Sequence, residues 1–325
     1  MSLGGFFRNL IDRILPELYE FNPFNLHPKL ATAVAYCNAR QWRELSSLYE
    51  NLDHFQAHFI TDGLAHLIKD DTFFDGWCEK NRGYYLPHLL RGALLLKRAW
   101  IYRGYGRGED VTDARAIKFY DTLEISFAEL TAAANLDQEK SEASALAIRA
   151  LMGLGGDWSD IDSAYQRMRK PGEFNFTGEI NYLVASCEKW HGSHEKMFAF
   201  SRRTYANNSH PAVAGLIAEA HHEKYMYLAA FEEDEDAAIA YLDDETVGTE
   251  LLEASRRLID GTTDSARYET LEAHGYFAMI FSLAKRFDHA EIHFETIGQS
   301  ITHQPWDFYD IDFLNHSRRK SLARR

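Results

Sequence analysis

The feature that most constrains this chain is a spacing of apolar residues that recurs in three places. Each set reads aromatic, two residues, aliphatic, three residues, aromatic: Trp42, Leu45 and Tyr49; Trp158, Ile161 and Tyr165; Phe287, Ala290 and Phe294. On a helix these offsets place all three side chains on one stripe. A short turn and an apolar helical segment precede each set, so the spacing predicts pairs of helices that pack through these stripes.

Further amphipathic segments extend this pairing along most of the chain. Apolar residues recur in them at intervals of three and four, and the seven prolines mostly fall where segments begin or end. The predicted pairs are residues 28–39 with 42–51, 53–69 with 72–81, 85–104 with 113–135, 138–154 with 158–170, 176–190 with 193–207, 211–230 with 245–260 and 268–284 with 287–298. We therefore predict an all-α fold, a right-handed alpha-alpha superhelix or solenoid of about seven helical hairpins.

The predicted domain organisation has three parts. Residues 1–20 form a one-sided apolar helix that caps the open end of the stack. The repeat domain covers residues 28–300, with an irregular insertion at 231–244 that begins in an acidic run. Residues 301–325 form an aromatic and basic tail, in which Trp306 packs on the last hairpin. We expect its basic end to be solvated, with docking on an anionic surface as the alternative.

Charge and cysteine content narrow the classes of function. A total of 49 acidic against 35 basic side chains leaves a net charge of −14, which repels phosphate backbones and predicts no nucleic-acid partner. The three cysteines are far apart in apolar helical patterns, which is typical of reduced, buried thiols in a cytoplasmic protein. No run approaches the ~18 apolar residues that cross a bilayer, so we expect neither a signal peptide nor a membrane contact.

One segment resembles the tetratricopeptide repeat. Residues 273–297 carry the apolar pattern of that repeat, with Phe277, Ala278, Phe281, Ala284, Phe287, Ala290 and Phe294. His194 and Met197 stand 36 residues after Trp158 and Ile161, close to the ~34-residue period of that family. The resemblance implies stacked helical hairpins, although Ser201 replaces the last aromatic of this copy.

Two further stretches resemble an uncharacterised bacterial family of tetratricopeptide-like proteins. The first runs from Trp100 to Gly106 with the pattern W-x2-R-G-x-G. The second runs from Lys189 to Phe198 with the pattern K-W-x-G-S-x3-M-F. This resemblance implies the same fold and no assigned activity.

The candidate binding residues lie in or beside these two stretches, which depart from pure packing patterns. They are Trp100, Arg103, Trp190, His194 and Arg202. An arginine beside a tryptophan can bind a peptide carboxylate, although burial of Trp100 in the core is the simpler interpretation. A curved stack presents a concave face, so we predict a non-enzymatic scaffold that binds a protein or peptide partner there, with no cofactor and no bound metal.

Two alternatives to a scaffold remain open. A metal-dependent hydrolase or small-ligand-binding protein would use His191, His194 and His222, but no His-Glu-x-x-His spacing places two ligands on one helix face. Self-association through the aromatic ends would make the chain a homo-oligomer. The glycines between Arg103 and Gly108 lack the strand-turn-helix context of a phosphate loop, and no Gly-x-Ser-x-Gly occurs. The sequence identifies neither the partner nor the pathway.

Overall fold

The fold is helical throughout the part of the chain that can be described. The computed structural model describes residues 21–70, 72–104, 106–190, 192–263, 267–302, 305–306, 309 and 311–322. Within these ranges the secondary structure is helical and contains no strand. This confirms the predicted all-α class. The capping helix predicted over residues 1–20 lies outside the described residues.

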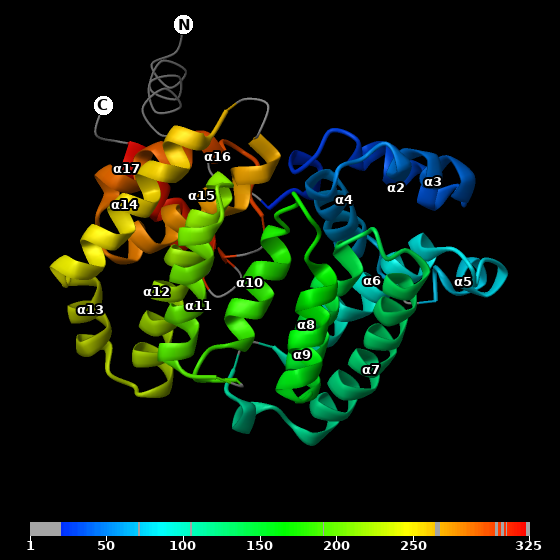
Figure 1. The fold of residues 1–325 in the computed structure, drawn as a ribbon, viewed down its shortest axis with the longest axis horizontal. Helices are drawn as coiled ribbons and strands as arrows, with labels where there is room; N and C mark the ends of the chain where they lie inside the picture. The colour runs from blue at the N-terminus through cyan, green and yellow to red at the C-terminus, as the bar shows by residue number, and fades with distance from the viewer. Residues whose placement is uncertain are drawn as a thin grey trace, which may run out of the picture. The chain divides into compact units, whose positions relative to one another are not determined.

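Contacts divide the chain into two compact units. Figure 1 labels the helices of the chain. Unit 1 consists of Met1–Asn25 with Ser201–Arg325, and unit 2 consists of Leu26–Phe200. The division falls inside helix α11 (His194–Asn207). The repeat domain expected over residues 28–300 therefore has parts in both units, and its continuity stays a prediction.

Unit 2 is built from hairpins whose first helices contact one another. Its helices are α2 (Leu30–Asn38), α3 (Trp42–Glu50), α4 (His54–Leu67), α5 (Asp75–Lys80), α6 (Tyr85–Arg103), η2 (Gly108–Asp110), α7 (Asp113–Leu136), α8 (Glu142–Leu154), α9 (Trp158–Met168), α10 (Phe176–Ala185) and the first part of α11. Contacts join α2 to α4, α4 to α6, α6 to α8 and α8 to α10. Each segment predicted here contains a helix.

Unit 1 follows the predicted pairs less closely. Its helices are η1 (Pro23–Asn25), the end of α11, η3 (Pro211–Ala214), α12 (Gly215–Met226), the π-helix η4 (Tyr227–Phe231), α13 (Glu235–Asp243), α14 (Glu245–Gly261), α15 (Arg267–Leu283), α16 (Phe287–Ile297) and α17 (Ile311–Leu322). The insertion at 231–244 is thus largely the helix α13 rather than irregular chain. Asp234 is the N-cap of α13 and accepts a hydrogen bond from the Ala237 N–H. The acids in the first turn of α13 interact favourably with the helix dipole.

The C-terminal segment contains a helix and packs against α16. Trp306 is buried and stacks on Phe294 with ring centroids 6.0 Å apart, which confirms that this aromatic stretch packs on the last hairpin. The basic end was expected to be solvated, and Arg319 and Lys320 are exposed, although α17 runs through this stretch and contacts α16. Ser317 and Ser321 are buried in α17, because an amphipathic pattern there offers one side to the core.

The recurring stripes are buried as predicted. The second and third positions of all three sets are less than 9% exposed, from Ile161 and Ala290 at 0% to Tyr165 at 7%. The helices α3, α9 and α16 each begin at the first aromatic of a set. That aromatic also packs: Trp42 stacks on Trp77 at 4.5 Å between centroids. The stripe therefore fixes both where the second helix starts and which side it buries.

The turn that precedes each stripe has the same conformation. Arg40, Gly155 and Lys285 have φ of 54°, 69° and 54°. In the last turn the Arg286 N–H donates to the Phe281 carbonyl, 2.8 Å away, and the other two turns contain the equivalent bond. This is the Schellman arrangement at a helix C-terminus, in which glycine is the favoured left-handed residue. Of these three turns, only the one at Gly155 has glycine at this position.

Lys285→Gly should stabilise unit 1. The left-handed conformation costs a non-glycine residue about 1–2 kcal/mol, and glycine loses about half of that gain through extra chain entropy. We expect a net gain of ~0.5–1 kcal/mol in the free energy of unfolding, measured by urea titration. Lys285→Ala removes the same exposed side chain but keeps the strain, so equal stability of the two variants would contradict this explanation.

Candidate functional site

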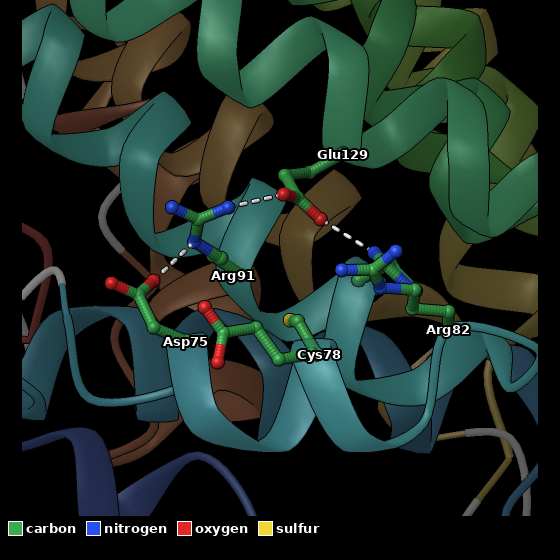
Figure 2. Close-up of a pocket in the computed structure, with 7 residues that line it drawn as sticks. Asp75, Cys78, Arg82, Arg91 and Glu129 are labelled. Atoms are coloured by element: carbon green, nitrogen blue, oxygen red, sulfur yellow. Dashed lines mark hydrogen bonds and ion pairs between the residues drawn. The ribbon is translucent and has the colours of Figure 1, made fainter.

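A polar pocket of about 410 Å³ opens in unit 2 (Figure 2). Its lining comes from α5, the turn after it, α6 and α7. The lining residues are Asp75, Cys78, Glu79, Arg82, His88, Arg91 and Glu129. Glu79 and Arg82 are exposed, whereas the others are half-buried or buried. The pocket thus has a charged, solvated rim and a more enclosed floor.

An ion-pair network forms the floor. The Arg91 guanidinium lies between two carboxylates: its Nε is 2.8 Å from Asp75 Oδ1, and its Nη1 donates to Glu129 Oε1 (Figure 2). The other oxygen of Glu129 is 2.6 Å from His88 Nδ1. The network ties α5 and α6 to α7, because each helix contributes at least one charged or polar group to it.

Cys78 lies next to this network with a protonated thiol. Burial, reinforced by the negative charge of Glu129, raises the pKa of the Cys78 thiol to about 12. A thiol of that acidity is a poor nucleophile at neutral pH. As it stands, the trio of Cys78, His88 and Glu129 does not form an activated-cysteine site.

The same trio has the arrangement of a metal-ligand set. Each of Cys78, His88 and Glu129 offers one donor atom, and these donors all lie within 4.8 Å of one another. Sequence analysis did not find this group. His88 follows Cys78 by ten residues and Glu129 follows His88 by 41, and no metal-binding motif has that spacing. In the sequence Cys78 is flanked by Asp75, Glu79 and Lys80, a pattern that by itself indicates only a partly solvated helix.

Three of the five candidate binding residues meet in unit 2. The rings of Trp100 and Trp190 contact edge to face at 5.9 Å between centroids, and the Arg103 guanidinium lies 5.8 Å from the centroid of Trp190. Arg149, which the sequence analysis did not select, lies over Trp100 at 4.4 Å. The two stretches that contain Trp100 and Trp190 are therefore in contact with each other.

Arg103 has a clear structural role in this cluster. Its Nη1 donates to the carbonyls of Gly104, at 3.0 Å, and Gly106, at 2.6 Å. Gly104 ends α6 with a φ of 70° and a ψ of −172°, a backbone region that is essentially restricted to glycine. The guanidinium thus holds the chain that leaves α6. The predicted contribution of Arg103 and Trp100 to binding stays a prediction.

The other two candidates lie elsewhere. His194 begins α11 in unit 2, where its N–H is 3.4 Å from Glu188 Oε2. Arg202 belongs to unit 1 and makes two hydrogen bonds of 2.7 Å to the Glu250 carboxylate. This pairing, together with His221, lowers the pKa of Glu250 to about 2. Arg202 therefore anchors α11 to α14 within unit 1.

The histidines of the hydrolase alternative are not shown to converge. His191 lies outside the described residues, His194 belongs to unit 2, and His222 to unit 1. Both ring nitrogens of His222 have partners: Nδ1 is 2.9 Å from Glu219 Oε2, and Nε2 is 3.0 Å from the Tyr309 hydroxyl. These contacts account for the burial of His222 without a metal ion.

The outer side of α7 is an unusual surface. Ile117, Tyr120 and Ile125 are 60%, 48% and 46% exposed. Two carboxylates, those of Asp121 and Glu124, are exposed on the same side. Offsets of three, four and seven residues place these groups together on a helix. We call these five residues the α7 face.

Comparison of the chain with protein-family models, with curated proteins and with solved structures found no match. None of the described helices is both long and apolar enough to span a membrane.

Proposed function

We propose that this chain is a non-enzymatic scaffold that binds a protein or peptide partner through the α7 face, in place of the concave face that the sequence suggested. The observation that carries the proposal is the exposure of Ile117, Tyr120 and Ile125 on one side of one helix. Large apolar side chains scattered singly on a surface need no explanation, whereas a group of them is typical of an interaction site. Covering them would remove apolar area from water at about 25 cal/mol per Å².

The partner that fits the α7 face is a basic amphipathic segment. Asp121 and Glu124 lie between the apolar side chains, so a partner must bring both apolar groups and cations. The net charge of −14 steers cationic segments toward the chain. An amphipathic helix with lysine or arginine beside its apolar stripe satisfies both requirements.

The wider architecture belongs to the same proposal. Contacts between the first helices of successive hairpins support a right-handed superhelix of the tetratricopeptide kind. Lys118 of α7 lies 5.8 Å from the Tyr102 ring centroid, so the α7 face begins beside the end of α6 that carries Trp100 and Arg103. The three cysteines are free and buried, which supports a cytoplasmic location.

Binding can be tested with a synthetic helix-forming peptide of leucine and lysine, labelled for fluorescence anisotropy. The double variant I117S/I125S should bind it at least about tenfold more weakly than the wild type, because two apolar contacts are lost. The affinity should also fall as salt is raised, since the carboxylates of the α7 face are solvated.

Two controls decide whether the α7 face is responsible. Ile311→Ser removes an isoleucine that is 45% exposed on α17 and should leave affinity unchanged. A peptide with glutamate in place of lysine should not bind. Equal binding of the basic peptide to I117S/I125S and the wild type would refute the proposal. Light scattering that shows a dimer, dissociated by I117S/I125S, would instead assign the α7 face to self-association.

A further inference from the structure

The floor of the polar pocket brings together three kinds of metal donor from three helices. Cys78 of α5 supplies sulfur, His88 of α6 nitrogen, and Glu129 of α7 oxygen, all within 4.8 Å of one another. Zinc takes this mixture of donors, whereas Mg²⁺ and Ca²⁺ prefer oxygen alone. Donors bound to one tetrahedral zinc ion lie roughly 3.5 Å apart, so the longest donor separation needs to contract by up to about 1.3 Å.

The protonation of His88 suits metal binding. The Glu129 carboxylate can only accept, so the 2.6 Å contact places the ring proton on His88 Nδ1. The lone pair then lies on Nε2, a buried atom with no hydrogen-bond partner among the described residues. Buried polar atoms normally have a partner. Metal-binding histidines characteristically have one nitrogen held by a carboxylate and the other facing the ion.

Charge around the floor balances a divalent ion. Once bound, Cys78 is a thiolate, so it joins Asp75 and Glu129 as a third anion. Among the described residues that line the pocket, Arg91 is the cation that pairs with both carboxylates. Three anions against one cation leave two negative charges, which a divalent ion neutralises.

We propose that the floor of this pocket binds one thiophilic divalent ion, of which Zn²⁺ is the type. Cys78 and His88 bind it directly, and Glu129 is the third group, as a ligand or as the carboxylate that orients the His88 ring. All three residues line the pocket, so the coordination positions that the protein leaves open face a space of about 410 Å³. An open position beside the protein ligands is the arrangement of reactive rather than purely structural zinc sites. This departs from the expectation of no bound metal and does not depend on the α7 face.

The full chain, stripped of metal with a chelator, should bind one Zn²⁺ or Co²⁺ ion. It should bind this ion more tightly than any further ions that bind at the surface. Co²⁺ should produce a thiolate-to-metal charge-transfer band, because one ligand is sulfur. Zn²⁺ should raise the melting temperature of unit 2, since it bridges three helices of the folded state.

Matched variants identify the ligands. Cys78→Ala should abolish the charge-transfer band and weaken binding at least about tenfold. Cys37→Ala removes the other buried thiol of the first hairpins, which is 1% exposed. It should change neither the charge-transfer band nor the affinity for the metal. His88→Ala should weaken binding as Cys78→Ala does, with its metal-free melting temperature showing that it folds.

Three results would overturn the inference. They are the absence of a tight ion in the wild type, a charge-transfer band that survives Cys78→Ala, and an affinity that His88→Ala leaves intact. Any of them would leave the floor with only the ion-pair network of Asp75, Arg91, Glu129 and His88, which ties α5, α6 and α7 together.

Discussion

Gly192→Ala should destabilise unit 2 by about 3 kcal/mol or more. A Cβ atom at Gly192 would lie 1.9 Å from the carbonyl oxygen of Ser186, which no real contact reaches. The obstacle is backbone rather than a flexible side chain. It is held there because Ser186 O accepts from the Ser193 N–H at 3.1 Å, and the Gly192 N–H donates to Cys187 O at 3.2 Å. The methyl group can be placed only if this turn between α10 and α11 opens.

Gly76→Ala is the matched control for this substitution. A Cβ at Gly76 meets nothing within 4 Å, and the residue lies in α5, where alanine is favoured over glycine. We expect it to be neutral or stabilising by up to ~1 kcal/mol. Urea titration monitored by tryptophan fluorescence measures both variants. A Gly192→Ala variant within ~1 kcal/mol of the wild type would show that the close approach is relaxed at little cost.

Acid should destabilise unit 1 through a buried histidine pair. His274 of α15 and His293 of α16 are 1% and 0% exposed, with their Nδ1 atoms 2.8 Å apart. The Thr262 hydroxyl donates to the Leu258 carbonyl, so it accepts from His274 Nε2. His274 Nδ1 is then an acceptor, and the proton between the rings belongs to His293. Ser255 donates to the remaining nitrogen of His293.

Every donor and acceptor of this network is used when both rings are neutral, so an added proton has no place. Burial lowers the pKa of His274 to about 4, and burial, with His274 and His289 nearby, lowers the pKa of His293 well below its usual value. Phe277 and Phe281 stack on His293 and add no charge that would compensate. The two histidines bind protons near pH 6.5 in the unfolded chain, whereas in the folded chain they stay neutral at that pH.

The direction of the pH dependence of stability follows from this difference in proton binding. The unfolded state holds more protons below pH 6.5, so stability is full above that pH and is lost as pH falls toward about 4. Lowering the pH from about 7 to about 5 should reduce the free energy of unfolding of unit 1 by about 2 kcal/mol through His274 alone. His293 should reduce it further.

The slope of stability against pH tests this independently of stability itself. His293→Gln should reduce the proton uptake on unfolding at about pH 5 by roughly one, whatever it does to the melting temperature. His316→Gln, on the exposed side of α17, should leave the slope unchanged. A slope that is the same in His293→Gln and the wild type would show that His293 is protonated in the folded chain.

Much of the helix pattern could be predicted because its signals are local. The helix α9 begins at Trp158 and buries Ile161 and Tyr165, as the spacing of those residues predicted. The errors arose where local signals conflict. The acids that suggested an irregular insertion also cap and charge the start of α13, and the expected tail contains the helix α17.

The candidate site was harder to predict than the fold. The contact of Trp100 and Arg103 with Trp190 joins two stretches that sequence analysis had selected, but the carbonyls that Arg103 binds could not be anticipated. Cys78 and His88 lay in segments read as packing helices, and nothing in the sequence linked them to Glu129. The α7 face was hidden in an amphipathic segment, since a pattern does not tell which apolar residues a neighbour leaves uncovered.

The sequence by itself determined that the chain is helical, where most hairpins turn and which stripes are buried. These properties follow from the helical period and from residues a few positions apart. Only the tertiary structure decided that His88 meets Glu129, that His274 meets His293, and that Ile117 remains in water. Such contacts depend on the rotation and spacing of neighbouring helices, which arise from packing of side chains far apart in the chain and leave no periodic trace in it.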